Sequence, residues 1–294
     1  MKSLIKLSSL VILGFFLLVT AHLTFLYLHR ESKMTVQDFY HPFISTLDGL
    51  TDENARNQAI HIVQQPFSYL GAGQQMIAFE SHDQRYVIKF FRPIRRIREE
   101  RFHQFKTLRE FFTSRWIFPI YFQKKRQLLK LFQCYQVAFD VLREESGLLY
   151  VHLHRTSALP HSLCLTDKDG IAHTIDLTLA PFVLQEKAEL ASASLHSAIQ
   201  AGEQKKAQEM VKKLQQLFIS RTTKGFTDNA QTLHNNYGFL RDKAIQIDLG
   251  KLYFDKHLLC DPHAEIQKLL LNLENSLQHI SPSLCEHLLK KTDP

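Results

Sequence analysis

The sequence predicts a protein of the α+β class, in which a strand-rich half is followed by a mostly helical half. Hydrophobic residues make up 45% and charged residues 22% of the chain, which is the composition of a folded domain and not of a disordered chain. Apolar runs of strand length, separated by polar turns, dominate residues 67–190. Longer segments with apolar residues at helical spacing dominate residues 191–294.

An apolar segment comes before both halves. Residues 7–28 contain no Asp, Glu, Lys or Arg. A helix of this length, rising about 1.5 Å per residue, is roughly 33 Å long and could cross a hydrocarbon core of about 30 Å. Residues 1–33 are therefore predicted to form a single-pass transmembrane anchor. A signal peptide cleaved after the small residues 19–21, or a buried helix of the folded domain, would also fit the pattern.

The region between the anchor and the first strands is expected to be helical. Residues 34–66 form a predicted helical linker, with a helix over 34–64 and Thr51 as an N-cap. The pattern then changes to strands. The runs 76–80 (MIAFE) and 86–91 (YVIKFF) flank the polar turn Ser-His-Asp-Gln, which predicts a β-hairpin.

The rest of the strand-rich half contains one expected helix and several expected strands. Residues 94–115 are rich in charge and carry apolar residues at helical spacing, which predicts a helix. Turn signals separate the later apolar runs, one of them at 167–170. The expected strands lie at 128–139, 147–154, 173–179 and 181–190.

The second half is expected to be mostly helical. Residues 192–220 predict a strong helix, with Gly202 marking a break or a helical hairpin. After a loop at 221–236, two short strands are expected around Arg241 and Asp242. The two strands are expected at 237–240 and 243–249. Two further helices are expected at 262–277 and 282–290.

Charge and cysteine content limit the classes of function. The chain has a formal net charge of +7, and the basic excess is concentrated between Lys89 and Lys130. This stretch is either a solvated helix face or a surface for anionic lipid or phosphate. The sequence has no RNA-binding signature or zinc-finger spacing, so no nucleic-acid partner is expected. The 4 cysteines lie far apart, which favours reduced thiols, although disulfides remain open.

Two features of the strand-rich half suggest phosphate binding. Gly71 and Gly73 lie in a turn between two strands, where the lack of a Cβ would let backbone N–H groups approach a phosphate. An ordinary hairpin turn would look the same. Lys89 lies on an otherwise apolar strand, and a buried ammonium needs an anionic partner. A lysine that extends from an edge strand into solvent is the alternative.

These features occur in an order that resembles the protein kinases. The segment 86–89 (Tyr-Val-Ile-Lys) resembles the lysine motif on the third strand of that family. Asp248, followed by Leu-Gly, resembles its metal-binding Asp-Phe-Gly, and Asn236 resembles the Asn of its catalytic loop. The resemblance covers about residues 67–255 and implies a two-lobed protein-kinase-like fold with a reduced C-lobe.

The resemblance also implies binding of ATP and Mg²⁺. The nucleotide would be held by Gly71, Gly73, Lys89 and Glu110, and the metal by Asn236 and Asp248. Glu110 is expected to lie on the helix after the lysine strand and to pair with Lys89; Glu99 and Glu100 are the other candidates for this role.

The match is incomplete where the family carries its catalytic aspartate. Gln231 stands at that position, and the chain has no His-Arg-Asp motif. Asp228 is the nearest acidic residue and is the predicted catalytic residue, acting on the acceptor hydroxyl; His234 is an alternative base. No Ala-Pro-Glu follows Gly250, so the platform for protein substrates is expected to be missing or replaced.

Three hypotheses of function remain open. The first is a membrane-anchored kinase-like protein that binds Mg-ATP and transfers phosphate to a hydroxyl acceptor, with its globular domain in the cytoplasm, where ATP is available. The second is an inactive pseudokinase or another membrane-tethered interaction module with a protein partner. The third is an exported protein that uses no nucleotide. Basic residues flank both ends of the apolar segment equally, so they do not fix its orientation.

Overall fold

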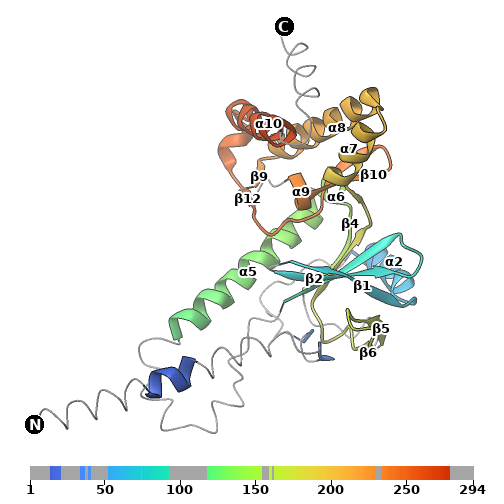
Figure 1. Cartoon of the computed structure of the whole chain (residues 1–294), viewed down its shortest axis with the longest axis vertical. Helices are drawn as coiled ribbons and strands as arrows, with labels where there is room; N and C mark the ends of the chain where they lie inside the picture. The colour runs from blue at the N-terminus through green and yellow to red at the C-terminus, as the bar shows by residue number, and fades with distance from the viewer. Residues whose placement is uncertain are drawn as a thin grey trace, which may run out of the picture. The chain divides into compact units, whose positions relative to one another are not determined.

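The structure is a computed structural model of the 294-residue chain, and it has α+β architecture (Figure 1). The chain divides into two compact units, residues 1–35 and residues 36–294. The structure describes residues 14–20, 34–36, 39–40, 52–73, 75–92, 118–153 (118–125 as backbone), 159–160, 162–228 and 233–278.

The described part of the first unit comprises a short helical stretch at residues 14–20 and the two residues 34–35. The apolar side chains of the helical stretch are exposed, and the Thr20 hydroxyl donates to the carbonyl oxygens of Phe16 and Leu17 within the helix. The rest of the predicted span, residues 7–28, lies outside the described residues. Among the residues that are described, no helix is both long and apolar enough to pass through a membrane.

A mixed seven-stranded sheet forms the first half of the second unit. The strand order is β4-β7-β3-β2-β1-β5-β6, with β1 parallel to β5 and the other neighbours antiparallel. The strands are β1 (Phe67–Ala72), β2 (Met76–Ser81), β3 (Tyr86–Phe91), β4 (Leu148–His152), β5 (Leu163–Thr166), β6 (Ala172–Ile175) and β7 (Phe182–Glu186). β7 lies between β3 and β4, so its neighbours in the sheet both come earlier in the chain.

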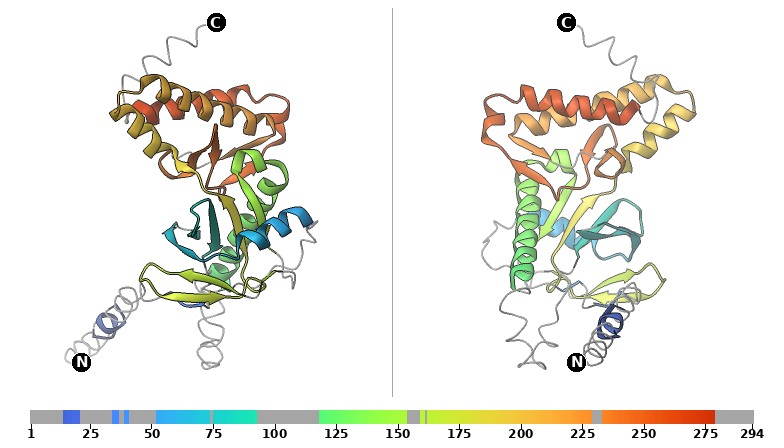
Figure 2. Two further views of the ribbon diagram at one scale, coloured as in Figure 1. Left: turned by 90° about the vertical axis from the view of Figure 1, so that its right-hand side faces the viewer. Right: turned by 60° about the vertical axis from the view of Figure 1, so that its left-hand side comes forward.

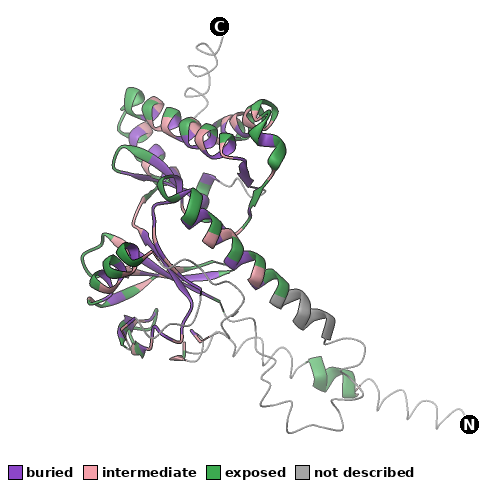
Figure 3. Ribbon diagram, turned by 180° about the vertical axis from the view of Figure 1, so that it is seen from behind, coloured by how far each residue is buried: buried purple, intermediate pink, exposed green. Residues whose placement is uncertain are grey.

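The central strands of this sheet are buried along most of their length (Figure 3). β3 has five consecutive buried residues, and β7 has four. Aromatic rings fill the core around them: Phe90 lies 6.0 Å from both Phe79 and Phe182, and 4.9 Å from Phe39. Strands buried on both faces contain continuous apolar runs instead of alternating ones, which explains why YVIKFF and FVLQ could be recognised in the sequence.

One predicted strand of this half is a helix. Residues 128–139 belong to α5 (Phe118–Val141), which packs on the sheet and brings Phe132 to 4.5 Å from Phe91. The same apolar residues that suggested a strand also follow helical spacing, and here burial of a helix face decides the outcome. The buried face is formed by Leu128, Leu131, Phe132, Tyr135, Ala138 and Phe139.

The helix predicted before the sheet is shorter than expected. α2 spans Glu53–Ile62 and does not begin at residue 34. Its N-cap is Asp52 and not Thr51, because the Asp52 carboxylate accepts a hydrogen bond of 3.0 Å from the backbone N–H of Ala55. A short helix, α6 (Arg143–Ser146), follows α5 and ends at Gly147 in the left-handed conformation.

Helices form the core of the second half (Figure 2). α7 (Ala191–Gln200) and α8 (Gln204–Thr223) form the helical hairpin predicted at Gly202, whose φ is +72°. α10 (His263–Gln278) packs on α8 through Leu269, Leu273 and Leu277. The shorter helices of this half are α9 (Leu233–Asn236) and the 3-10 helix η4 (Lys256–Leu259).

Two small sheets complete this half in the part of the chain that is described. β10 (Tyr237–Leu240) and β11 (Lys243–Gln246) form the predicted hairpin, and β10 also pairs with β8 (Glu189–Leu190). β9 (Phe226–Asp228) pairs with β12 (Leu252–Phe254). Because β8 directly follows β7, the chain passes from the large sheet into the helical half at residues 187–190.

Several sequence expectations need correction or fall outside the described residues. β5, β9 and β12 were not predicted, and residues 173–179 form a strand only up to Ile175. The predicted helices at 94–115 and 282–290 lie outside the part of the chain that the structure describes. Cys134, Cys164 and Cys260 are unpaired, whereas Cys285 is not among the described residues.

Candidate functional site

Lys89 lies in the middle of β3, the most buried strand of the large sheet. Its side chain is 9% exposed, and its ammonium Nζ donates a hydrogen bond of 2.8 Å to the carbonyl oxygen of Ile247. Burial lowers the pKa of Lys89 to about 8, and the negative charge of Asp248 opposes this shift. The lysine of the large sheet therefore reaches directly to the end of the β10–β11 hairpin.

Asp248 follows β11 and stays exposed to solvent. Its Oδ1 accepts a hydrogen bond of 3.0 Å from the backbone N–H of Gly250, which closes a tight turn. Leu249, between them, is buried. Tyr135 of α5 lies beneath this turn: burial raises the pKa of Tyr135 well above its usual value, and the charge of Asp248 adds to the increase.

The turn between β1 and β2 also reaches this place. A Cβ on Gly250 would lie 1.9 Å from Oε1 of Gln75, so the Gln75 side chain lies directly against the glycine. Gly71 ends up inside β1, next to a bulge in the register, and Gly73 lies in the turn, where its N–H donates to the carbonyl oxygen of Met76 at 2.9 Å. A Cβ would meet nothing within 4 Å at Gly71, so packing does not demand a glycine there.

Asn236 and Asp228 approach the same turn from two other elements. Asn236 is the last residue of α9, and its carbonyl oxygen accepts a hydrogen bond of 2.7 Å from the N–H of Ile247. Asp228 is the last residue of β9 and is 3% exposed. Its carboxylate accepts a short hydrogen bond from Nε2 of Gln246, and the same nitrogen donates at 2.9 Å to the carbonyl oxygen of Asp248.

Apart from the two turn glycines, five residues are expected to bind nucleotide, bind metal or act in catalysis. Four of these five lie among the described residues, and they come together at one place. Separate elements bring Lys89, Asp228, Asn236 and Asp248 to the end of the β10–β11 hairpin. Glu110, like Glu99 and Glu100, lies outside the described residues. The helix that the structure does describe after β3, α5, contains a single acidic residue, Asp140, which is exposed and bonds to Gln136.

Two residues in this arrangement were missed by sequence reasoning. Gln246 is 1% exposed although it looked like an outward-facing polar residue of a strand. Arg221 is completely buried on α8, and its Nη1 donates to Oε1 of Gln246 at 2.5 Å. The sequence did contain a sign that Arg221 is buried: it lies three residues after Phe218, on the apolar face of the same helix.

The oxygen ligands at this place suit magnesium. Asp248 offers an exposed carboxylate. The backbone of Asn236 lies close to it, because the Asn236 carbonyl oxygen accepts a hydrogen bond from the N–H of Ile247, the residue before Asp248. Mg²⁺ is usually held by one or two carboxylates together with phosphate oxygens and water, and not by a complete cage of protein ligands. Within the described residues, no group of three or more His, Cys, Asp or Glu side chains gathers in a way that could hold a metal ion by itself.

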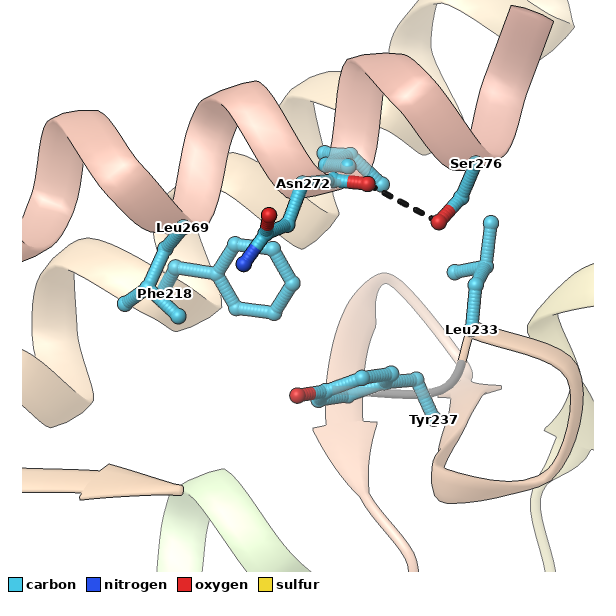
Figure 4. A pocket seen from close by; sticks show the side chains of 7 residues that line it. Phe218, Leu233, Tyr237, Leu269, Asn272 and Ser276 are labelled. Carbon is cyan, nitrogen blue, oxygen red and sulfur yellow. Dashed lines mark hydrogen bonds between the residues drawn. The ribbon is translucent and has the colours of Figure 1, made fainter. Parts of the chain in front are cut away.

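A small cavity lies elsewhere in the helical half (Figure 4). Its volume of about 10 Å³ is close to the minimum for a single water molecule. Phe218 from α8, Tyr237 from β10 and Asn272 from α10 line it, with Leu233, Leu269, Leu273 and Ser276. Lys89 and Asp248 are not among the lining residues, so this cavity is separate from the site described above.

Comparisons with known proteins give little information. No protein-family model matches the chain, and no curated protein matches it. Among solved structures, the chain is similar to the bifunctional kinase-methyltransferase WbdD, with a TM-score of 0.32 and 12% sequence identity. The match covers 82% of this chain but only 40% of that one.

Proposed function

We propose that this chain is a kinase-like protein that binds Mg-ATP between its large sheet and the end of the β10–β11 hairpin, and transfers phosphate to a hydroxyl acceptor. The proposal depends on one observation, that the Lys89 ammonium lies close enough to Asp248 to feel its charge. One residue comes from the centre of the seven-stranded sheet and the other from the hairpin of the second half, and the Lys89 ammonium bonds to the residue just before Asp248.

The order of the elements supports a kinase-like, two-lobed fold. In protein kinases the phosphate-binding lysine lies on the third strand, and the metals are held by an Asp and by a catalytic-loop Asn. Here Lys89 lies on β3, Asn236 comes just before the β10–β11 hairpin, and Asp248 comes just after it. The convergence of these three residues at one end of the hairpin supports the proposal.

Each residue has a role in the proposed reaction. The turn with Gly71 and Gly73 would cover the phosphates, and Lys89 would neutralise their charge, with Glu110 as the acid that orients the ammonium. Asp248 and Asn236 would hold a magnesium ion, which would supply positive charge against the negative charge that develops on the phosphate during transfer.

Transfer itself would depend mainly on position. The acceptor oxygen forms a bond to the γ-phosphorus while the bond from that phosphorus to the bridging oxygen of ADP breaks, and the hydroxyl proton leaves the acceptor. Asp228 would accept this proton or orient the hydroxyl. Alignment of donor and acceptor in one cleft can supply much of the rate enhancement.

ATP binding by the purified full-length chain tests the proposal. We expect calorimetric titration to detect Mg-ATP binding, and the dissociation constant to rise at least about tenfold in Lys89→Met and in Asp248→Asn, because each removes a charge-assisted contact to phosphate or metal. Lys168→Met and Asp242→Asn, which change exposed residues of the same types in surface turns, are the matched controls. Absence of Mg-ATP binding by the folded wild-type chain would refute the proposal.

An inactive pseudokinase is the second candidate, and the burial of Asp228 favours it. This carboxylate is only 3% exposed and already accepts a hydrogen bond from Gln246. An acceptor hydroxyl would therefore have to reach a buried carboxylate that already has a hydrogen-bond donor. The discriminating measurement is turnover: Mg-ATP binding without release of ADP on any hydroxyl acceptor favours the pseudokinase. Asp228→Asn should abolish turnover and keep binding if the chain is an active kinase.

The proposal includes a membrane location. The uncharged run at residues 7–28 would anchor the chain in a single pass, with the globular unit on the cytoplasmic side, where ATP is available. Extraction with alkaline carbonate distinguishes an anchored protein from a peripheral one. Reporter fusions at the C-terminus that are active only outside the cytoplasm would contradict the use of ATP.

A further inference from the structure

Gln246 occupies the centre of a buried hydrogen-bond chain that connects α8 to both aspartates of the site. Its Oε1 accepts a hydrogen bond from Nη1 of Arg221, at 2.5 Å. Its Nε2 donates to the Asp228 carboxylate and, at 2.9 Å, to the carbonyl oxygen of Asp248. The side chain is 1% exposed, so water does not compete with these partners.

The chemistry of the partners fixes the orientation of the amide. A guanidinium has only donors, whereas a carboxylate and a carbonyl oxygen have only acceptors. Turning the amide over would place its oxygen against the two acceptors and its NH₂ against Arg221, and every hydrogen bond would be lost. Both protons of Nε2 are therefore committed, one to the residue proposed to act on the acceptor and one to the residue proposed to hold the metal.

Arg221 supplies the positively charged end of this arrangement. The guanidinium is completely buried on α8, and its Nη1 donates to Gln246. A buried cation needs a nearby anion, and the Asp228 carboxylate lies at the other side of the same amide. The neutral amide thus separates a buried positive charge from a buried negative one and bonds to both.

From this arrangement, and resting on the function proposed above, we propose that Gln246 is a positioning residue that holds the Asp248 turn where it can bind Mg²⁺ and fixes the Asp228 carboxylate beside it. It touches neither nucleotide nor metal. It acts through the two aspartates, in the way that partners behind metal ligands commonly hold those ligands in place.

The chain offers a matched control for an ordinary buried glutamine. Gln185 on β7 is also 1% exposed, and its Nε2 donates to the carbonyl oxygens of Ser146 and Gln246. Its amide nitrogen thus bonds to backbone carbonyl oxygens and not to an aspartate. Gln185→Met and Gln246→Met remove the same kind of group from the core, but only the second disconnects the two aspartates.

The experiment measures the dissociation constant of ATP for the full-length chain in excess Mg²⁺ and again in EDTA. The ratio of the EDTA value to the Mg²⁺ value reports how strongly the metal favours binding. We expect Gln246→Met to reduce this ratio about 10- to 100-fold, the usual effect of removing a partner behind a metal ligand, and to change the value in EDTA less than about threefold. Gln185→Met should keep the wild-type ratio, even if its melting temperature falls as far as that of Gln246→Met.

A wild-type ratio in Gln246→Met overturns the inference. If this variant does not fold, Gln246→Glu decides in its place, because a carboxylate still accepts from Arg221 but cannot donate to the aspartates. Its added negative charge would by itself strengthen metal attraction, so a reduced ratio in Gln246→Glu points to lost positioning, and an undiminished ratio overturns the inference. A wild-type chain that binds no ATP in either buffer is a different result, because it refutes the proposed function itself.

Discussion

Lys89 is placed where two electrostatic effects oppose each other. Burial in the centre of the sheet disfavours the ammonium, whereas Asp248 and the carbonyl oxygen of Ile247 favour it. Burial dominates, since the pKa falls to about 8. A cation that is poorly compensated in the ligand-free chain would gain from the arrival of phosphate, so the same residue that weakens folding would strengthen nucleotide binding.

This balance predicts a pH-dependent effect of Lys89→Met on stability. Because the pKa is lower in the folded chain, near 8, than the ordinary 10.5, the unfolded chain binds more protons between these values, and wild-type stability rises with pH across that window. Lys89→Met lacks this gain. At pH 7 we expect the variant to be more stable than wild type, by at most roughly 3 kcal/mol from the shift of the pKa.

The measurement is urea unfolding of both proteins at pH 7 and at pH 10. The difference between the two free energies of unfolding should shrink at the higher pH, because the lysine is then largely neutral in the folded chain. Other titrating groups are common to both proteins and cancel in the difference. A difference that is equal at the two pH values would mean that Lys89 is not held in a desolvated site.

At the scale of elements, the passage from the large sheet to the helical half depends on a close backbone approach. β8 pairs with β10, and a Cβ on Gly238 would lie 2.7 Å from the carbonyl oxygen of Glu189 and 2.9 Å from Cβ of Ala188. The first of these atoms belongs to the backbone, so a side chain at residue 238 could be accommodated only by shifting the strand. The glycine therefore lets residues 187–190 lie against the hairpin that carries Asp248.

Gly238→Ala is accordingly expected to destabilise the chain. Overpacking of this kind costs about 1–3 kcal/mol, and here the contact is with backbone. Gly71→Ala is the control, because its added Cβ would meet nothing within 4 Å. Thermal or urea unfolding compares the two variants. Equal stability of the two would show that β8 and β10 do not approach as closely as the structure has them.

The elements also show what the sequence could and could not predict. β3 and the β10–β11 hairpin were predicted because their apolar runs are bounded by clear turns. β9 and β12, with three residues each, are too short to show a period. α5 was mistaken for a strand because residues 128–139 are apolar enough for either structure, and the choice is made by packing on Phe91.

The same reasoning explains the candidate site. Lys89, Asn236 and Asp248 could be chosen because motif order identifies them without knowledge of packing. Gln246 could not, because in Lys-Ala-Ile-Gln it alternates like a solvent-facing residue of a strand. Only the tertiary structure reveals that α8 covers this face with Arg221.

The nature of α5 leads to its own prediction. Phe132 lies on the buried face, with its ring 4.5 Å from that of Phe91, and Val137 lies on the exposed face. Phe132→Ala should lower the free energy of unfolding by about 3–5 kcal/mol, because it leaves a cavity between helix and sheet. Val137→Ala should change it by less than about 0.5 kcal/mol. Similar losses in urea unfolding would contradict the packing of Phe132 between α5 and the large sheet.

At the scale of the globular unit, its two halves are connected by more than the chain itself. Lys89 bonds across to Ile247, and β8 joins the small sheet of the second half. A third connection is made by Glu145 on α6, whose Oε1 accepts from the Ser220 hydroxyl and pairs with the Lys224 ammonium, both at 2.6 Å. These contacts predict that the large sheet and the helical half unfold together and not in separate steps.

Glu145 gives the clearest test of this connection. Burial alone would raise the pKa of its carboxyl, but the hydrogen bonds from Lys224 and Ser220 outweigh burial and lower the pKa below 4.5. The charged form therefore stabilises the folded chain above the ordinary pKa, and this contribution is lost as the pH falls through the lower, folded value. Glu145→Gln should lower the free energy of unfolding by about 1–2 kcal/mol at pH 7. The loss should diminish as the pH falls below 4.5, and it should vanish below the lower, folded pKa, where Glu145 of the folded wild-type chain is also neutral.

Its neighbour in the sequence serves as the control. Glu144 is also on α6, but its side chain is 85% exposed and lies 3.8 Å from Lys243, so Glu144→Gln should have little effect at either pH. Urea unfolding followed by both near-ultraviolet and far-ultraviolet circular dichroism reports stability and cooperativity together. If Glu145→Gln separates the transition into two steps, the carboxylate connects halves that are otherwise independent. If it costs as little as Glu144→Gln at pH 7, the contact between α6 and α8 does not stabilise the unit.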